Sequence, residues 1–170
     1  MKLVNFYGSE GIQAGLVHDR GVEDLAASDL WRGPAPVALR DISALAAKLG
    51  PPASPLVPME SLRLAPVVVA PEKIICVGLN YRRHAVEANM PIPTTPVIFG
   101  KFANSLTASG DPVAIPAVDH KYDYEAELAV IIGRAKRATC RSTRRWTTSR
   151  LIAALTISPR AVPNSPPASG

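Results

Sequence analysis

The sequence of 170 residues predicts an α+β protein, with a small N-terminal α/β domain followed by a part that is richer in strands. Three observations predict this class. Short apolar stretches at residues 3–7, 12–18 and 22–25 are separated by turn residues, which is typical of a small antiparallel sheet. Residues 37–49 carry apolar side chains at helical spacing. The apolar runs after residue 73 are short and bounded by Gly or Pro, which favours strands over long helices.

Prolines mark the boundary between these two parts. Residues 53–66 are interrupted by prolines and read as a connector, so we expect a first domain over residues 1–66. The second part, residues 67–137, opens with an apolar run that predicts a buried strand, and a short helix is expected after it. The elements expected there are strands at residues 74–79, 97–99, 113–115 and 122–132 and a helix within residues 80–88.

Charge and composition favour a soluble metabolic enzyme. Residues 1–133 hold eleven basic and fourteen acidic side chains, whereas residues 134–170 hold eight basic side chains and no acidic one. The basic balance therefore belongs to the tail and does not indicate a nucleic-acid partner for the body. Cys76 and Cys140 suggest neither a disulfide framework nor a zinc site. Because no signal peptide or membrane-length apolar run is evident, we expect a cytoplasmic protein without membrane contact.

Acidic residues alternate along the strand expected at residues 122–132. Asp123, Glu125 and Glu127 share one face if this segment is extended. Neighbouring carboxylates raise each other's pKa unless a cation lies between them, and a hard divalent cation is well suited to such oxygen ligands. The alternative is a solvated acidic edge. Glu-x-Glu alone favours this alternative, but the apolar residues 128–132 weaken it, because they are expected to draw the strand into the core.

A histidine and a glutamate are paired on the short helix expected within residues 80–88. His84 and Glu87 are three positions apart and therefore face the same way on a helix. A carboxylate beside an imidazole orients it and raises its pKa, which makes His84 a candidate general base. The alternative is a surface pair without chemistry. His18 and His120 are assigned no role.

Several motifs in one order resemble the fumarylacetoacetate hydrolase family. The resemblance is strongest over residues 71–137 and weaker before Pro66; Phe102 departs from it, since family members often have Pro there. The matching motifs are Lys73–Tyr81 with His84 and Glu87, Pro96–Lys101, Gly110-Asp111-Pro112 with Ile115-Pro116, and Asp123–Leu128 with Gly133.

This resemblance implies an incomplete β-rich roll that binds Mg²⁺, or Mn²⁺ or Ca²⁺, through Glu125 and Glu127. It implies hydrolysis of a C–C bond in an acylpyruvate or fumarylacetoacetate-like 1,3-dicarbonyl substrate, with the metal stabilising the enolate that is released. His84, supported by Glu87, would activate water, and Lys101 is expected as a third catalytic residue. An isomerase, decarboxylase or lyase acting on a 2-oxo or 2-hydroxy-diene acid is the alternative. The expected partner is a small oxo acid, and the full-length protein is expected to be a homodimer.

The basic tail at residues 138–170 does not continue the resemblance. It is rich in Arg, Ser, Thr and Pro and has no amphipathic period. Reading GC-rich codons for Thr139–Arg150 in a shifted frame gives Val-Ser-Val-Asp-Glu-Ala-Leu-Asp-Tyr-Val-Ala, a helix like that of the family. We therefore expect a disordered tail derived from a frameshift, and a chain that is truncated and inactive because no Asp or Glu follows Glu127. The alternative is a non-catalytic fragment whose basic tail binds nucleic acid without specificity.

Overall fold

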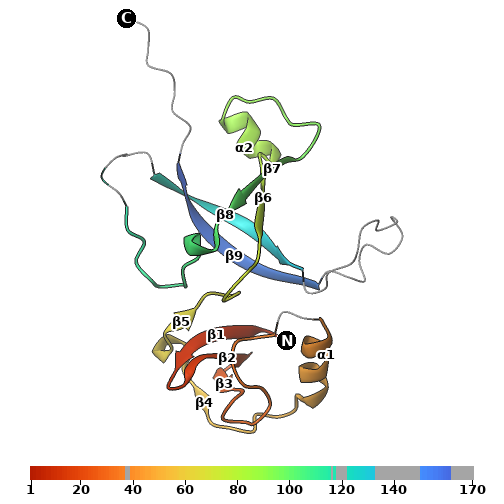
Figure 1. Ribbon diagram of the computed structural model, residues 1–170, viewed down its shortest axis with the longest axis vertical. Helices are drawn as coiled ribbons and strands as arrows, with labels where there is room; N and C mark the ends of the chain where they lie inside the picture. Colours follow the sequence, from red (N-terminus) through yellow and green to blue (C-terminus); the bar gives the residue numbers. More distant parts are fainter. Residues whose placement is uncertain (37–38, 116, 118–121, 133–149, 162–170) are drawn as a thin grey trace, which may run out of the picture.

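The computed structural model describes residues 1–36, 39–115, 117, 122–132 and 150–161, and the side chains of all of these except 39–40, 122–126 and 150–161. It contains helices and strands in separate segments, which confirms the α+β class. Figure 1 shows the N-terminal domain at the bottom and the later strands above it. In the described part of the chain, no helix has the length and apolar character needed to cross a bilayer.

The N-terminal domain is a five-stranded antiparallel sheet with one helix against it. The strands are β1 (Leu3–Gly8), β2 (Gly11–His18), β3 (Gly21–Asp24), β4 (Leu56–Val57) and β5 (Leu64–Ala65), in the order β4-β3-β2-β1-β5. The helix α1 spans Leu39–Lys48, and a 3₁₀ turn, η1, spans Met59–Ser61. The expected meander and helix are therefore present. The connector differs from expectation, because both of its short strands complete the sheet.

The core of this domain lies between the sheet and α1. Ala14 and Leu16 of β2, Leu25 after β3 and Leu45 of α1 form one buried cluster. Leu45 sits on the apolar face that the helical spacing predicted. Leu30, Trp31 and Leu49, among others, pack around the cluster. The domain therefore has a hydrophobic core of its own.

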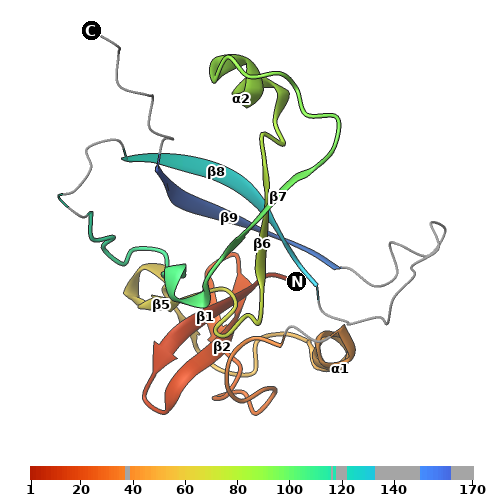
Figure 2. The same cartoon turned by 45° about the horizontal axis from the view of Figure 1, so that its top comes forward.

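The second part consists of two separate strand pairs. Strand β6 (Ile74–Gly78) pairs with β7 (Val97–Lys101), and β8 (Tyr122–Ile131) pairs with β9 (Arg150–Ala161), both antiparallel. Between β6 and β7 lies the helix α2 (Arg82–Glu87), and a 3₁₀ turn, η2, spans Ala103–Ser105. Figure 2 shows α2 at one end of the β6–β7 pair, well away from the N-terminal domain.

Besides the connector, two further expectations of secondary structure differ from the structure. Residues 113–115 form no strand; Val113 and Ile115 are exposed, and Pro112 and Pro116 beside them have no N–H to donate to a ladder. Residues 150–161 were expected to lack regular structure, but they form β9. Its apolar run Leu151–Leu155 is able to pair along the open edge of β8, and this pairing extends over both glutamate positions. Residues 138–149 and 162–170 lie outside the described part.

Candidate metal and acid–base site

The helix α2 places His84 and Glu87 on one short segment beyond β6. Ala85 is completely buried and anchors the helix, while His84 is half-buried and Glu87 is exposed. Leu79, in the turn that leads from β6 to α2, has a φ of 49°, a left-handed conformation that is uncommon for a bulky residue. This turn sets the direction in which α2 leaves the strand. The expected helix for the two residues is confirmed, and their catalytic roles remain predictions.

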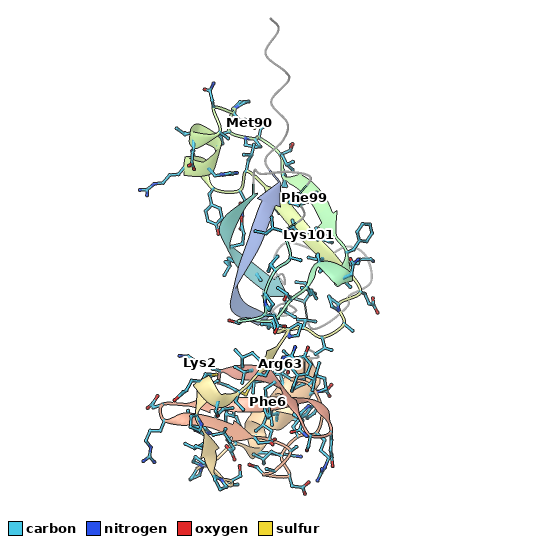
Figure 3. All side chains as sticks on the ribbon, turned by 90° about the vertical axis from the view of Figure 1, so that its left-hand side faces the viewer. Lys2, Phe6, Arg63, Met90, Phe99 and Lys101 are labelled. Atoms are coloured by element: carbon cyan, nitrogen blue, oxygen red, sulfur yellow. The ribbon has the colours of Figure 1, made fainter. Side chains whose placement is uncertain are left out.

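Lys101 is the last residue of β7, opposite Ile74 of β6. Figure 3 shows Lys101 beside Phe99 on the sheet. Met90 lies close to α2, at the opposite end of the sheet from Lys101 (Figure 3). Lys101 is half-buried, and both it and His84 interact with other groups of the protein. The segment from β6 through α2 to β7 therefore carries all three residues that were predicted to be catalytic, with His84 on α2 and Lys101 at the far end of β7.

The two predicted metal ligands lie on β8. Glu125 pairs with Ser158 of β9, and Glu127 pairs with Thr156. The side chain of Glu127 is half-buried, as are those of Ala129 and Ile131, whereas Leu128 and Val130 are exposed. Glu127 therefore belongs to the more sheltered face of the strand. The side chain of Glu125 lies outside the described part.

The structure does not pack the two groups of predicted residues against each other. In the described part of the chain, neither α2 nor the β6–β7 pair makes an extensive contact with β8. Among the side chains that the structure describes, no three His, Cys, Asp or Glu residues are grouped as a metal site. The prediction that His84 reaches the space in front of both carboxylates stays a prediction.

A family profile identifies the second part of the chain. The profile described as "Fumarylacetoacetate (FAA) hydrolase C-terminal" matches residues 73–158, which is half of the chain. The chain belongs to the fumarylacetoacetate hydrolase family. All five predicted site residues lie within the matched segment of this family. The match also continues past Arg137, where the sequence suggested a boundary.

Relatives in the fumarylacetoacetate hydrolase family include oxaloacetate tautomerases. The chain is 51% identical over 71 residues to "Oxaloacetate tautomerase fahd2, mitochondrial" of Xenopus laevis, covering 42% of this chain and 22% of that protein. It is 42% identical over 91 residues to "Oxaloacetate tautomerase FAHD2A, mitochondrial" of Homo sapiens, covering 54% and 27%. The chain thus spans about a quarter of the length of these relatives.

A solved structure of the same family confirms the fold. An HpcE protein from Mycobacterium smegmatis matches with a TM-score of 0.65 and 32% identity. The match covers 88% of this chain and 52% of that chain. The mixed fold of helices and strands is therefore of the fumarylacetoacetate hydrolase type.

The residues on β8 fit a divalent cation in their chemistry. Enzymes of the fumarylacetoacetate hydrolase family commonly use divalent metals. Glu127 offers carboxylate oxygens on the sheltered face of β8, and hard cations such as Mg²⁺ prefer oxygen ligands. Glu125 occupies the alternate position of the same strand. The donor type and the spacing in the chain both suit such an ion.

A buried carboxylate in the N-terminal domain was missed by the sequence reasoning. Glu23 is 1% exposed; its Oε1 accepts hydrogen bonds from Ser28 Oγ at 2.6 Å and from the Ala53 N–H at 2.9 Å, and its Oε2 lies 3.0 Å from His18 Nε2. Burial raises the pKa of Glu23, but the bonds from Ser28, Ala53 and His18 outweigh burial and lower this pKa below its ordinary value. His18 and Glu23 flank a tight turn between two strands, and this spacing in the sequence could have indicated that the two side chains meet.

Proposed function

We propose that this chain carries the metal-binding first part of an enzyme that interconverts the keto and enol forms of a 2-oxo acid of the oxaloacetate type. The proposal is supported chiefly by the 51% and 42% identity to proteins named oxaloacetate tautomerases. The predicted site residues lie within the family match at residues 73–158.

Each predicted residue has a role in this proposal. Glu125 and Glu127 would hold a divalent cation, which is Mg²⁺ or alternatively Mn²⁺ or Ca²⁺. When bound, the cation supplies positive charge to the carboxylate and ketone oxygens of a 2-oxo acid. His84 takes a proton from the substrate and returns it, so that the proton moves between the enol oxygen and the carbon beside the ketone. Glu87 orients the imidazole, and Lys101 offers a positive charge to the distal carboxylate of the substrate.

Hydrolysis of acylpyruvates is the second candidate function. It requires the same metal and the same base, but His84 would then deprotonate a water that attacks the carbonyl carbon, and the C–C bond would break. The family name supports this reaction, and the names of the relatives favour the tautomerase. Decarboxylase and lyase chemistry start from the same type of substrate, but the names of these relatives do not favour them.

The test begins with metal binding by this chain itself. Mn²⁺ affinity is measured by electron paramagnetic resonance for the unaltered chain and for Glu125→Gln, Glu127→Gln and Glu60→Gln. Glu60 is an exposed carboxylate of the N-terminal domain and serves as the control. We expect weak binding that is lost in both β8 variants, since a cation held by two carboxylates keeps most of its coordination shell as water. Equal affinity in all four proteins would remove the metal site.

Activity is then assayed on this chain and on a chain continued after Arg137 in the alternative reading frame. Decay of oxaloacetate enol absorbance and cleavage of an acylpyruvate are followed with Mg²⁺ and with a chelator. We expect Mg²⁺-dependent tautomerisation by the second chain, reduced about 10²- to 10⁴-fold by His84→Gln. Acylpyruvate cleavage without enol decay would instead establish the hydrolase. Absence of both reactions would refute the proposal.

We also propose a frameshift origin for residues 138–170 and a cytoplasmic location for the protein. A frameshift after Arg137 is tested by the nucleotide sequence, which should encode the family-like helix in the shifted frame. The cytoplasm is proposed from the sequence, although both relatives described above carry "mitochondrial" in their names. Fractionation of cells that express the protein distinguishes the two compartments.

A further inference from the structure

Arg63 connects the N-terminal sheet to the second part of the chain. Its guanidinium carbon lies 4.7 Å from the centre of the Tyr7 ring, and its Nη2 lies 3.6 Å from Oδ1 of Asp111. Its carbonyl also accepts a hydrogen bond of 2.9 Å from the Tyr7 N–H. Figure 3 shows Arg63 where the N-terminal domain faces the later strands. Because Tyr7 belongs to β1 and Asp111 to the turn after η2, this side chain bridges the two parts.

Asn5 fixes the direction in which the chain leaves the N-terminal domain. Its side chain is buried within β1, where Nδ2 donates to the carbonyls of Pro66 at 2.9 Å and Val67 at 3.0 Å. Its Oδ1 accepts a hydrogen bond of 2.7 Å from the Ala35 N–H. The first residues of the linker are therefore held against β1, and the bonds of Asn5 are difficult to exchange for water.

The end of β8 lies beside the same face of the N-terminal domain. Ile131 lines a small apolar cavity together with Leu3, Val4 and Val67. Figures 1 and 2 both show this end of β8 near the start of β1. Ile131, at the end of the strand that carries Glu125 and Glu127, thus lies beside the domain that Arg63 and Asn5 attach.

We propose that the N-terminal domain is a platform that positions β8, and that Arg63 is the positioning residue that latches the two parts together. Among the described residues, β8 makes no extensive contact with the β6–β7 pair or with any helix or strand of the N-terminal domain, so its position relative to that domain depends on a few contacts. An exposed ion pair alone contributes little. Here, however, the same guanidinium also covers an aromatic ring, and Asp111 lies in the turn from which the chain continues to β8. The consequence for metal binding rests on the proposed function.

A charge swap tests the latch. Arg63→Asp and Asp111→Arg are compared with the double variant by hydrogen exchange of the β8 amides and by Mn²⁺ affinity. We expect each single variant to speed β8 exchange by about tenfold and to weaken Mn²⁺ binding. The double variant should partly restore both the slow β8 exchange and the Mn²⁺ affinity, because the ion pair returns while the contact with Tyr7 does not. Arg63→Lys, which keeps the charge, should change β8 exchange least.

Arg32→Asp is the matched control. Arg32 Nη2 pairs with Asp29 Oδ1 at 3.1 Å on the surface of the N-terminal domain, so its loss should leave β8 unchanged. If Arg63→Asp also exposes the amides of β1–β3, Asp111→Asn carries the same test without altering that domain. Unchanged β8 exchange in the single variants, or no rescue in the double variant, would overturn the platform. If the double variant restores slow β8 exchange but no variant binds Mn²⁺, the platform proposal stands and the proposed metal site is refuted.

Discussion

The N-terminal domain and the second part use similar apolar strands but bury them very differently. Leu25 is 0% exposed in the first region, where α1 covers one face of the five-stranded sheet. Ile75 of β6 is 66% exposed, although it too lies in an apolar strand. Beyond residue 66, the buried hydrophobic residues that the structure describes are Ala85 and Ala108, and both have small side chains.

The two regions differ in whether another element covers the apolar face of the strands. A sheet must cover its apolar face with another element, and α1 does this in the N-terminal domain. The β6–β7 and β8–β9 pairs are two-stranded and do not stack on each other extensively in the described part of the chain. Hydropathy in the sequence therefore indicates which strands are apolar enough to be buried. Whether such a strand is buried depends on the element that the fold places against it.

The largest expected effect separates the two regions directly. Leu25→Ala should lower the free energy of unfolding by about 3–5 kcal/mol, because the cavity lies in a closed core. Ile75→Ala should change it by less than about 0.5 kcal/mol, because the side chain is already exposed. Urea unfolding followed by circular dichroism measures both. Equal losses would show that β6 is covered in solution.

The carboxylate of Glu23 provides the next effect. Glu23→Gln should cost about 2–3 kcal/mol at pH 7, because three donors lose an ionised acceptor. The lowered pKa of Glu23 makes its stabilisation complete above the ordinary pKa of a Glu and lost as the pH falls through the lower, folded-state pKa. Thermal unfolding between pH 7 and pH 3 should therefore depend less on pH in this variant. Glu10→Gln, at an exposed turn, should keep the dependence of the unaltered protein.

Loss of the linker contact should have a smaller effect. Asn5→Ala should destabilise the N-terminal domain by about 1–3 kcal/mol, because the Ala35 N–H and two linker carbonyls lose their partner. Hydrogen exchange of residues 65–70 should rise with it. Asn104→Ala, at an exposed position of η2, is the control and should leave the linker unchanged. Protection that survives in Asn5→Ala would mean that the linker is held by other contacts.

The smallest effect concerns the exposed face of β8. Val130→Thr should alter the unfolding free energy by less than about 0.5 kcal/mol, because Val130 is exposed, and should reduce self-association measured by analytical ultracentrifugation. Ile131→Thr lies on the sheltered face beside the N-terminal domain and should cost about 1 kcal/mol or more. The reverse order would mean that the two faces of β8 have been assigned the wrong way round.

The elements that depend on local pattern could be predicted from the sequence. The alternation at residues 3–18 and the helical spacing at residues 37–49 predicted β1, β2 and α1, and the apolar run at residues 74–79 predicted β6. The ordered motifs also predicted the family and the identity of the candidate site residues, His84, Glu87, Lys101, Glu125 and Glu127. These signals are visible in the sequence because each depends on residues close together in the chain.

Contacts between residues that are distant in the chain could not be predicted from the sequence and became known from the fold. The pairing of β4 with β3 and of β5 with β1, the bond between Ala53 and Glu23, and the contact of Arg63 with Asp111 join segments that are about 30 or more residues apart. Residues 113–115 and 150–161 show the same limit, since the first is apolar but unpaired and the second forms a strand because β8 offers an edge. Strand pairing depends on a partner, and the local sequence does not contain the partner.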